Sequence, residues 1–378
     1  MLKQSNLFIN EGKIVKENKA RQSNFELLRI ISILMIIAHH FAYHSEMQFD
    51  TSVIGVNRLW TQLLYYGGHV GLDAFVLISG YFLVDSVRIN LSKIARIWLV
   101  MFTYSAGTYW VMYLTGIRVD FFDEFKWLVI RPLSREIWPF ASAYCGLMLL
   151  YPFVNKLIKT LSKNSFRVLL AILLFFWSII PTFTTATYGC NYLLWMITLY
   201  MIAGYIKLYP EDFQRGRVFY RRIMFGFWGL SYASAIVLDI LGLKYEVCAK
   251  YATHFSGMQH INIVLIAICL FLVFRDVKIE KLSSCKAINA VAATTFGIYL
   301  IHDHPLLCRW IWKQLFRNAE YINEWWFVLA SIGEVIAIFA ACMIIEFARQ
   351  NLLEKWYMKG INKLLEKPQR FLDDIMNR

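Results

Sequence analysis

The stretch FELLRIISILMIIAHHFAY, residues 25–43, decides the fold class, because it is long and apolar enough to cross a bilayer. It nonetheless carries Glu26 and Arg29 near one end and His39 and His40 near the other. A charged group inside hydrocarbon costs several kcal/mol unless it faces protein or water. The stretch therefore predicts a membrane helix whose polar side chains need a protein partner.

The whole chain has the composition of a membrane protein. Of its 378 residues, 58% are hydrophobic and only 17% are charged, whereas soluble proteins carry about 25% charged residues. We expect an all-α polytopic domain over residues 25–346. Ten segments predict membrane helices, at about 25–43, 63–85, 95–115, 137–155, 168–186, 191–206, 223–243, 260–274, 287–304 and 325–346.

The positive charge is a signal of orientation. If the N-terminus is cytoplasmic, the inner flanks of these segments hold 28 of the 39 Lys and Arg residues, which predicts both termini inside. This distribution accounts for the net charge of +13, so we expect no nucleic-acid partner. Residues 1–24 predict a cytoplasmic segment without a cleavable signal peptide. Residues 347–378 predict a basic amphipathic cytoplasmic tail on membrane lipid, and a protein partner is the alternative.

The seven cysteines form no C-x-x-C pair, so the sequence has no zinc signature and no disulfide framework. His302 and His304 form an isolated H-x-H, which is weak evidence for a metal. We expect no metal in this protein.

The first segment places two chemically active groups on one face. Arg29 and His40 are 11 residues apart, which is close to three helical turns, or about 16 Å along the axis. Glu26 lies on the same side and predicts an ion pair with Arg29. A neutral imidazole in an apolar site keeps a free lone pair and can act as a general base. The alternative is that Arg29 reaches lipid phosphate and the histidines only pack.

Further polar residues stand in or beside other segments. Asp73 is an intramembrane acid that needs a partner, and a histidine or Arg29 is plausible. Lys93 and Arg96 follow the second segment and are either topology charge or a phosphate site. Glycines such as Gly71 predict close helix packing.

Five ordered motifs together resemble the membrane-bound acyltransferase 3 family, over about residues 21–346. The first is R-x10-H, from Arg29 to His40. The other four motifs are GLDAFVLISGYFL (71–83), SKIARIW (92–98), WPFASAYCGLMLLYPFVNKLI (138–158) and TTFGIYLIHDHP (294–305). Two residues depart from the family pattern: Lys93 replaces an arginine, and Ala74 stands where phenylalanine is common.

The resemblance implies a bacterial O-acyltransferase of the inner membrane that uses acetyl-CoA from the cytoplasm. The acceptor would be a hydroxyl of a lipid-linked or cell-surface polysaccharide. Some family members carry an extracytoplasmic esterase-like domain. This chain ends in a short basic tail, so we expect direct transfer or a separate extracytoplasmic transferase partner.

These observations combine into one hypothesis, in which a shared cavity joins Arg29 to His40. A transporter or flippase for a glycolipid is the rival, although no inverted repeat is evident. The expected roles are catalytic for His40 and Asp73, donor-binding for Arg29, Lys93 and Arg96, and acceptor-binding for Tyr144, Asn155 and His302.

Overall fold

A computed structural model describes residues 22–116, 125–126, 137–279 and 281–376. The predicted segment 1–24 therefore lies almost wholly outside the described residues, and so does most of the loop before Ile137. The described residues form helices, turns and loops and no strand, as the sequence predicts.

The helices follow one another in an order that matches the ten predicted segments. The first part of the chain forms α1 (Ser23–His44), α2 (Val56–Leu83), α3 (Leu91–Leu114) and α5 (Pro139–Thr160). Next come α6 (Lys163–Leu174), the π-helix η2 (Phe175–Ile179), α7 (Ile180–Phe183), α8 (Tyr192–Leu208), η3 (Pro210–Phe213), α9 (Arg217–Gly242), α10 (Glu246–Lys250), η4 (His254–Ser256) and α11 (Ile261–Arg275). The last part forms α12 (Leu282–Ala292), α13 (Thr295–His302), α14 (Pro305–Arg309), η5 (Trp310–Leu315), η6 (Asn318–Glu320), α15 (Phe327–Arg349), η7 (Gln350–Glu354) and α16 (Lys355–Met376).

Seven helical segments among the described residues are long and apolar enough to cross a membrane. They are Ser23–His44, Pro139–Thr160, Lys163–Phe183, Arg217–Gly242, Glu246–Arg275, Ser284–His302 and Phe327–Met376, and Tyr192–Leu208 is apolar but shorter. The protein is therefore a multi-pass membrane protein. The helices α2 and α3 reach 28 and 24 residues but do not fall among the seven. A total of ten spans and the orientation of the termini stay predictions.

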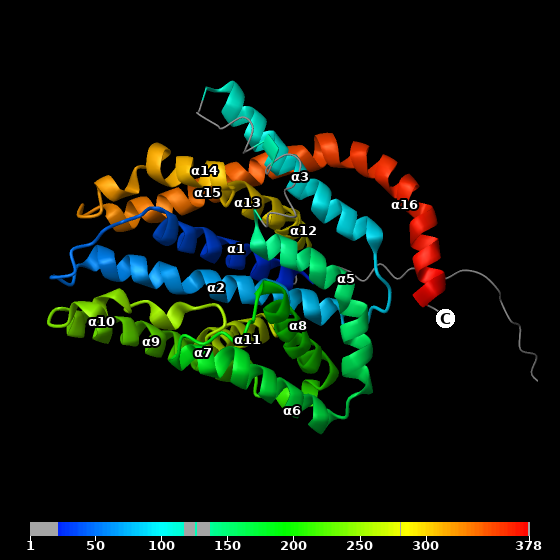
Figure 1. The fold of residues 1–378 in the computed structure, drawn as a ribbon, viewed down its shortest axis with the longest axis horizontal. Helices are drawn as coiled ribbons and strands as arrows, with labels where there is room; N and C mark the ends of the chain where they lie inside the picture. The colour runs from blue at the N-terminus through cyan, green and yellow to red at the C-terminus, as the bar shows by residue number, and fades with distance from the viewer. Residues whose placement is uncertain (1–21, 117–124, 127–136, 280, 377–378) are drawn as a thin grey trace, which may run out of the picture.

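The helices α1 and α2 lie side by side through the middle of the bundle (Figure 1). One buried hydrophobic cluster joins α2 to α5, α8 and α11. A second joins α1 to α13, α15 and η5. The residues Ile33 and Ile36 lie between Arg29 and His40 along the face of α1 that the sequence predicts these two to share, and both are buried. This face therefore lies against protein, as the polar groups of α1 require.

A glycine allows α1 and α2 to approach closely. A Cβ atom added at Gly71 would lie only 2.6 Å from the backbone oxygen of Ser32 in α1. Because that oxygen belongs to the backbone, the whole helix would have to move. The predicted packing role of Gly71 is confirmed by this contact.

The C-terminal helix α16 has no buried residue and curves away from the bundle (Figure 1). It is anchored to the start of α3. The Gln369 amide donates to the Ile89 carbonyl at 2.9 Å and accepts from the Leu91 N–H at 2.9 Å. The tail therefore packs against the chain's own loop between α2 and α3, which the sequence did not predict.

The substitution Gly71→Ala should lower the melting temperature of the purified protein. Overpacking a tight contact costs about 1–3 kcal/mol. The matched control is Gly229→Ala on α9, where an added Cβ meets nothing within 4 Å, and we expect no loss there. Thermal unfolding in detergent measures both, and equal melting temperatures for the two variants would contradict the close approach of α1 and α2.

Candidate functional site

Two histidines from distant parts of the chain meet at the C-terminal end of α1. His40 lies in the last turns of α1, and His302 is the last residue of α13. The helix α13 ends there because Pro305 disfavours a helical backbone at the preceding residue, and His304 is extended (φ −66°, ψ 130°). The Nδ1 atom of His40 lies 3.0 Å from the Nε2 atom of His302. His302 is fully buried, whereas the His40 side chain is 14% exposed.

The hydrogen bonds assign the proton of each ring. The Nδ1 atom of His302 lies 2.6 Å from the Ile298 carbonyl oxygen, which can only accept. His302 therefore carries its proton on Nδ1, and in the neutral ring its Nε2 atom accepts. The Nδ1 atom of His40 must then donate to His302. This leaves the Nε2 atom of a neutral His40 with a free lone pair.

A carboxylate lies beside this pair. In the turn after α13, the Oδ1 atom of Asp303 is 3.6 Å from Nδ1 of His40 and 3.5 Å from Nε2 of His44. Its negative charge favours a positively charged His40 during a proton transfer. Sequence reasoning did not assign roles to Asp303 or His44. The spacing of four residues between His40 and His44, one helical turn, was the available signal.

These groups line a cavity of about 920 Å³. His39 and His69 also line it, and each is held by a carbonyl oxygen: Nδ1 of His39 is 2.6 Å from Tyr65, and Nδ1 of His69 is 2.7 Å from Ser256. The other lining residues include the tyrosines Tyr43, Tyr65, Tyr192 and Tyr299 and the cations Arg309 and Lys313. Hydroxyls, imidazoles and aromatic rings together suit a polar ligand with hydroxyl groups.

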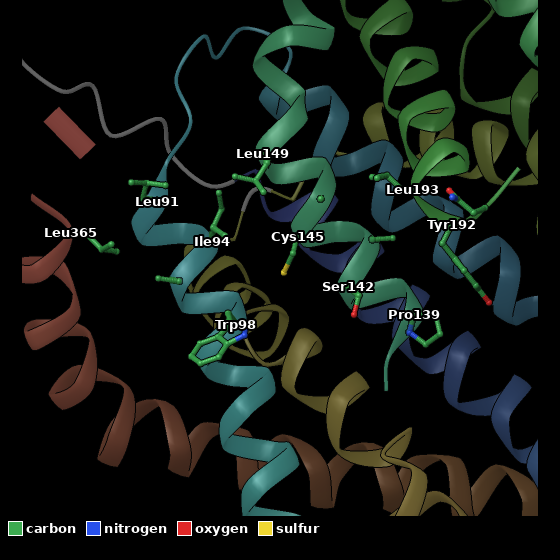
Figure 2. A pocket seen from close by; sticks show the side chains of 14 residues that line it. Leu91, Ile94, Trp98, Pro139, Ser142, Cys145, Leu149, Tyr192, Leu193 and Leu365 are labelled. Carbon is green, nitrogen blue, oxygen red and sulfur yellow. The ribbon is translucent and has the colours of Figure 1, made fainter. Parts of the chain in front are cut away.

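A second cavity of about 690 Å³ lies between α3 and α5 (Figure 2). It begins beside Leu91 and Ile94 in the first turns of α3, where Leu365 of α16 also lines it. At its other end it is lined by Pro139 and Tyr192, which also line the histidine cavity. The two cavities therefore adjoin, and together they extend from the start of α3 to His40.

The predicted basic residues lie at the opposite end of α1 from His40. Arg29 pairs with Glu26 at 3.3 Å, as predicted, and its side chain is 29% exposed. Lys93 is exposed at the start of α3, and Arg96 pairs with Glu354 at 2.6 Å. Arg29 lines neither cavity. Neither of these two cavities joins Arg29 to His40, so a cavity shared by the two residues stays a prediction.

Asp73 does not pair with a histidine or with Arg29, so that expectation is wrong. It is fully buried, and its Oδ1 atom accepts a hydrogen bond from the Trp195 indole at 3.0 Å. It lines neither cavity. Asp73 thus joins α2 to α8, and Asp303 is the carboxylate beside His40.

Tyr144 and Asn155, which we expected to bind the acceptor, also line neither cavity. The Tyr144 hydroxyl lies 3.1 Å from the Ser79 hydroxyl. The buried Asn155 amide donates to the carbonyls of Leu83 and Ser86 and accepts from Tyr200. Asn155 of α5 therefore connects the C-terminal end of α2 and the turn after it to Tyr200 of α8. Acceptor binding by Tyr144 and Asn155 stays a prediction. His302 also lines neither cavity, although it lies beside His40, which lines the larger one.

A family model described as an acyltransferase domain, acyltransferase 3, matches residues 22–347. The chain belongs to the acyltransferase 3 family. The match covers the bundle from α1 into α15 and every residue that lines the two cavities except Leu365, so this member is an acyl-transferring membrane enzyme. No curated protein and no solved structure matches the chain.

The substitution Asn155→Ala should destabilise this acyltransferase. Each buried polar group left without a partner costs about 1–3 kcal/mol. The change removes the amide that bonds to the Ser86 carbonyl and the Tyr200 hydroxyl, while the Leu83 carbonyl still accepts from the Ser86 N–H at 2.9 Å. The control is Asn351→Ala, because Asn351 is exposed and bonds only within its own helix. The melting temperature should fall for Asn155→Ala alone. An unchanged melting temperature together with a raised KM for acceptor would support the acceptor-binding role.

Proposed function

We propose that the protein transfers an acetyl group from cytoplasmic acetyl-CoA to a hydroxyl of a cell-surface or lipid-linked polysaccharide, in the inner membrane of a bacterium. The observation that carries the proposal is the free Nε2 atom of His40, set by its hydrogen bond to His302. A basic nitrogen at a cavity wall is what activation of a hydroxyl requires.

In the chemical step, Nε2 of His40 removes the proton of the acceptor hydroxyl while the hydroxyl oxygen attacks the thioester carbonyl. The C–S bond then breaks, and the CoA sulfur leaves with the proton returned by His40. The charge on the protonated ring is stabilised by Asp303 at 3.6 Å. Brief acetylation of Nε2, followed by transfer to the hydroxyl, needs the same free lone pair and is the alternative order of events.

The donor would reach His40 through the cavity between α3 and α5. Lys93 is exposed beside the start of that cavity and suits the phosphates of CoA. Arg96 can take part when it exchanges Glu354 for a phosphate, to which guanidinium binds well. The walls of the cavity are mostly apolar, with Ser142 and Asn191 as polar exceptions. A mostly apolar passage suits the pantetheine arm, whereas Arg29 lines neither cavity.

The acceptor would occupy the histidine cavity. Its tyrosines offer flat surfaces and hydroxyls to a sugar, and Arg309 offers a cation to an acidic group. At about 920 Å³ the cavity lies near the upper end of the range of about 300–1,000 Å³ for small-molecule sites, which leaves room for a sugar unit.

The substitution His40→Ala should lower the rate of acetyl transfer by about 10²–10⁴-fold, because general-base catalysis contributes that much. Purified protein is incubated with labelled acetyl-CoA and a glycan extract, and free CoA and labelled glycan are measured. The control is His254→Gln, since His254 lies outside the cavity and bonds to the Thr182 carbonyl at 3.0 Å. Full activity in a folded His40→Ala variant would refute the assignment, and a wild-type protein that releases no CoA would favour a transporter.

The substitution Ala143→Phe should raise the KM for acetyl-CoA or abolish transfer, because Ala143 lines the cavity between α3 and α5. The control is Leu150→Phe, which adds a ring on an exposed part of the same helix. Initial rates at varied acetyl-CoA concentration measure the effect. Equal KM values for Ala143→Phe and the control would show that the donor takes another path.

A further inference from the structure

His40, His44 and Asp303 form a cluster that the acyl-transfer chemistry does not fully use. Each offers one nitrogen or oxygen ligand atom, and these atoms all lie within 4.8 Å of one another. All three residues line the same cavity of about 920 Å³, so an ion held between them would have room for bound water. Two imidazoles and a carboxylate are a donor set that Zn²⁺ favours.

The distances are close to those of a tetrahedral site. Zinc lies about 2.0–2.1 Å from imidazole nitrogen or carboxylate oxygen, which places neighbouring ligand atoms about 3.3 Å apart. The Oδ1 atom of Asp303 lies 3.6 Å from Nδ1 of His40 and 3.5 Å from Nε2 of His44. To bind one zinc ion, only the ligating nitrogens of His40 and His44 would have to move closer to each other. The His44 side chain is 27% exposed and therefore has the freedom to rotate.

We propose that His40, His44 and Asp303 bind a divalent zinc ion that inactivates the enzyme. Zinc on Nδ1 of a neutral His40 would leave the ring proton on Nε2, which removes both the hydrogen bond to His302 and the free lone pair of the base. The ion and its water would also occupy the cavity where the hydroxyl must approach. The inhibition rests on the proposed function, whereas the binding of zinc does not.

The positive charges near the cluster lower its expected affinity for zinc. Asp303 supplies one negative charge, and Arg309 and Lys313 line the same cavity. Lys313 is paired with Glu46, which offsets its charge. The site is therefore expected to bind zinc reversibly rather than as a permanent structural ion. Cys308 also lines the cavity but is not part of the cluster.

Zinc binding is measured by calorimetry with zinc chloride on the full chain in detergent, after removal of any polyhistidine tag and of bound metal. We expect one zinc ion per protein. His44→Gln, which keeps a polar side chain of similar reach, should weaken binding by at least about 100-fold, since loss of an outer-shell partner alone costs 10–100-fold. Asp303→Asn should also weaken it, and His254→Gln should bind zinc as the wild type does.

X-ray absorption of the zinc-bound protein provides a second readout. Nitrogen and oxygen ligands at about 2.0–2.1 Å support the cluster, whereas a sulfur ligand at about 2.3 Å would overturn it in favour of Cys308. Absence of zinc binding, or equal binding by His44→Gln and the wild type, would also overturn it. Each protein's own rate without zinc is the reference for inhibition, and His44→Gln should resist zinc concentrations that inhibit the wild type.

Discussion

The hydrogen bond between His40 and His302 connects two helices that are 262 residues apart in sequence, and the chemistry of the site depends on it. A second hydrogen bond, from Nδ1 of His302 to the Ile298 carbonyl, places the proton of His302 on Nδ1. The proton of His40 therefore lies on its own Nδ1 atom, which donates to His302. Burial of His302 keeps water from competing for its bond to the Ile298 carbonyl. A reactive nitrogen is thus prepared by two contacts, neither of which involves substrate.

The rest of the bundle holds these two rings in place. Gly71 lets α2 approach α1 closely, and Pro305 ends α13 so that His302 and Asp303 lie in a turn rather than in a continuing helix. The cavity between α3 and α5 then adjoins the histidine cavity at Pro139 and Tyr192. A donor and an acceptor that approach from different directions would meet at His40.

The sequence predicted the parts of this arrangement that depend on periodicity. The helices, the inward face of α1 and the ion pair of Arg29 with Glu26 follow from spacing along one helix, and they are confirmed. Contacts between side chains on different helices could not be derived from spacing along one helix. Asp73 needed a buried partner, but spacing alone cannot distinguish the Trp195 indole from an imidazole.

Asn155 and Asp303 illustrate the same limit. The motif around Asn155 resembles the family, yet only the fold reveals that its amide connects the end of α2 to α8. Asp303 stands next to His302 in sequence, and its distance to His40 depends on the turn before Pro305. The membership of the family, by contrast, was evident from ordered motifs, and the match over residues 22–347 confirms it.

A double-mutant cycle on the two rings tests the central claim most directly. Acetyl-CoA-dependent release of CoA is compared for the wild type, His40→Ala, His302→Ala and the double variant, each checked for folding. If the two rings act as one unit, His302→Ala loses most of the rate and the double variant is no slower than His40→Ala. A wild-type rate for His302→Ala, or losses that multiply in the double variant, would contradict a base prepared by His302.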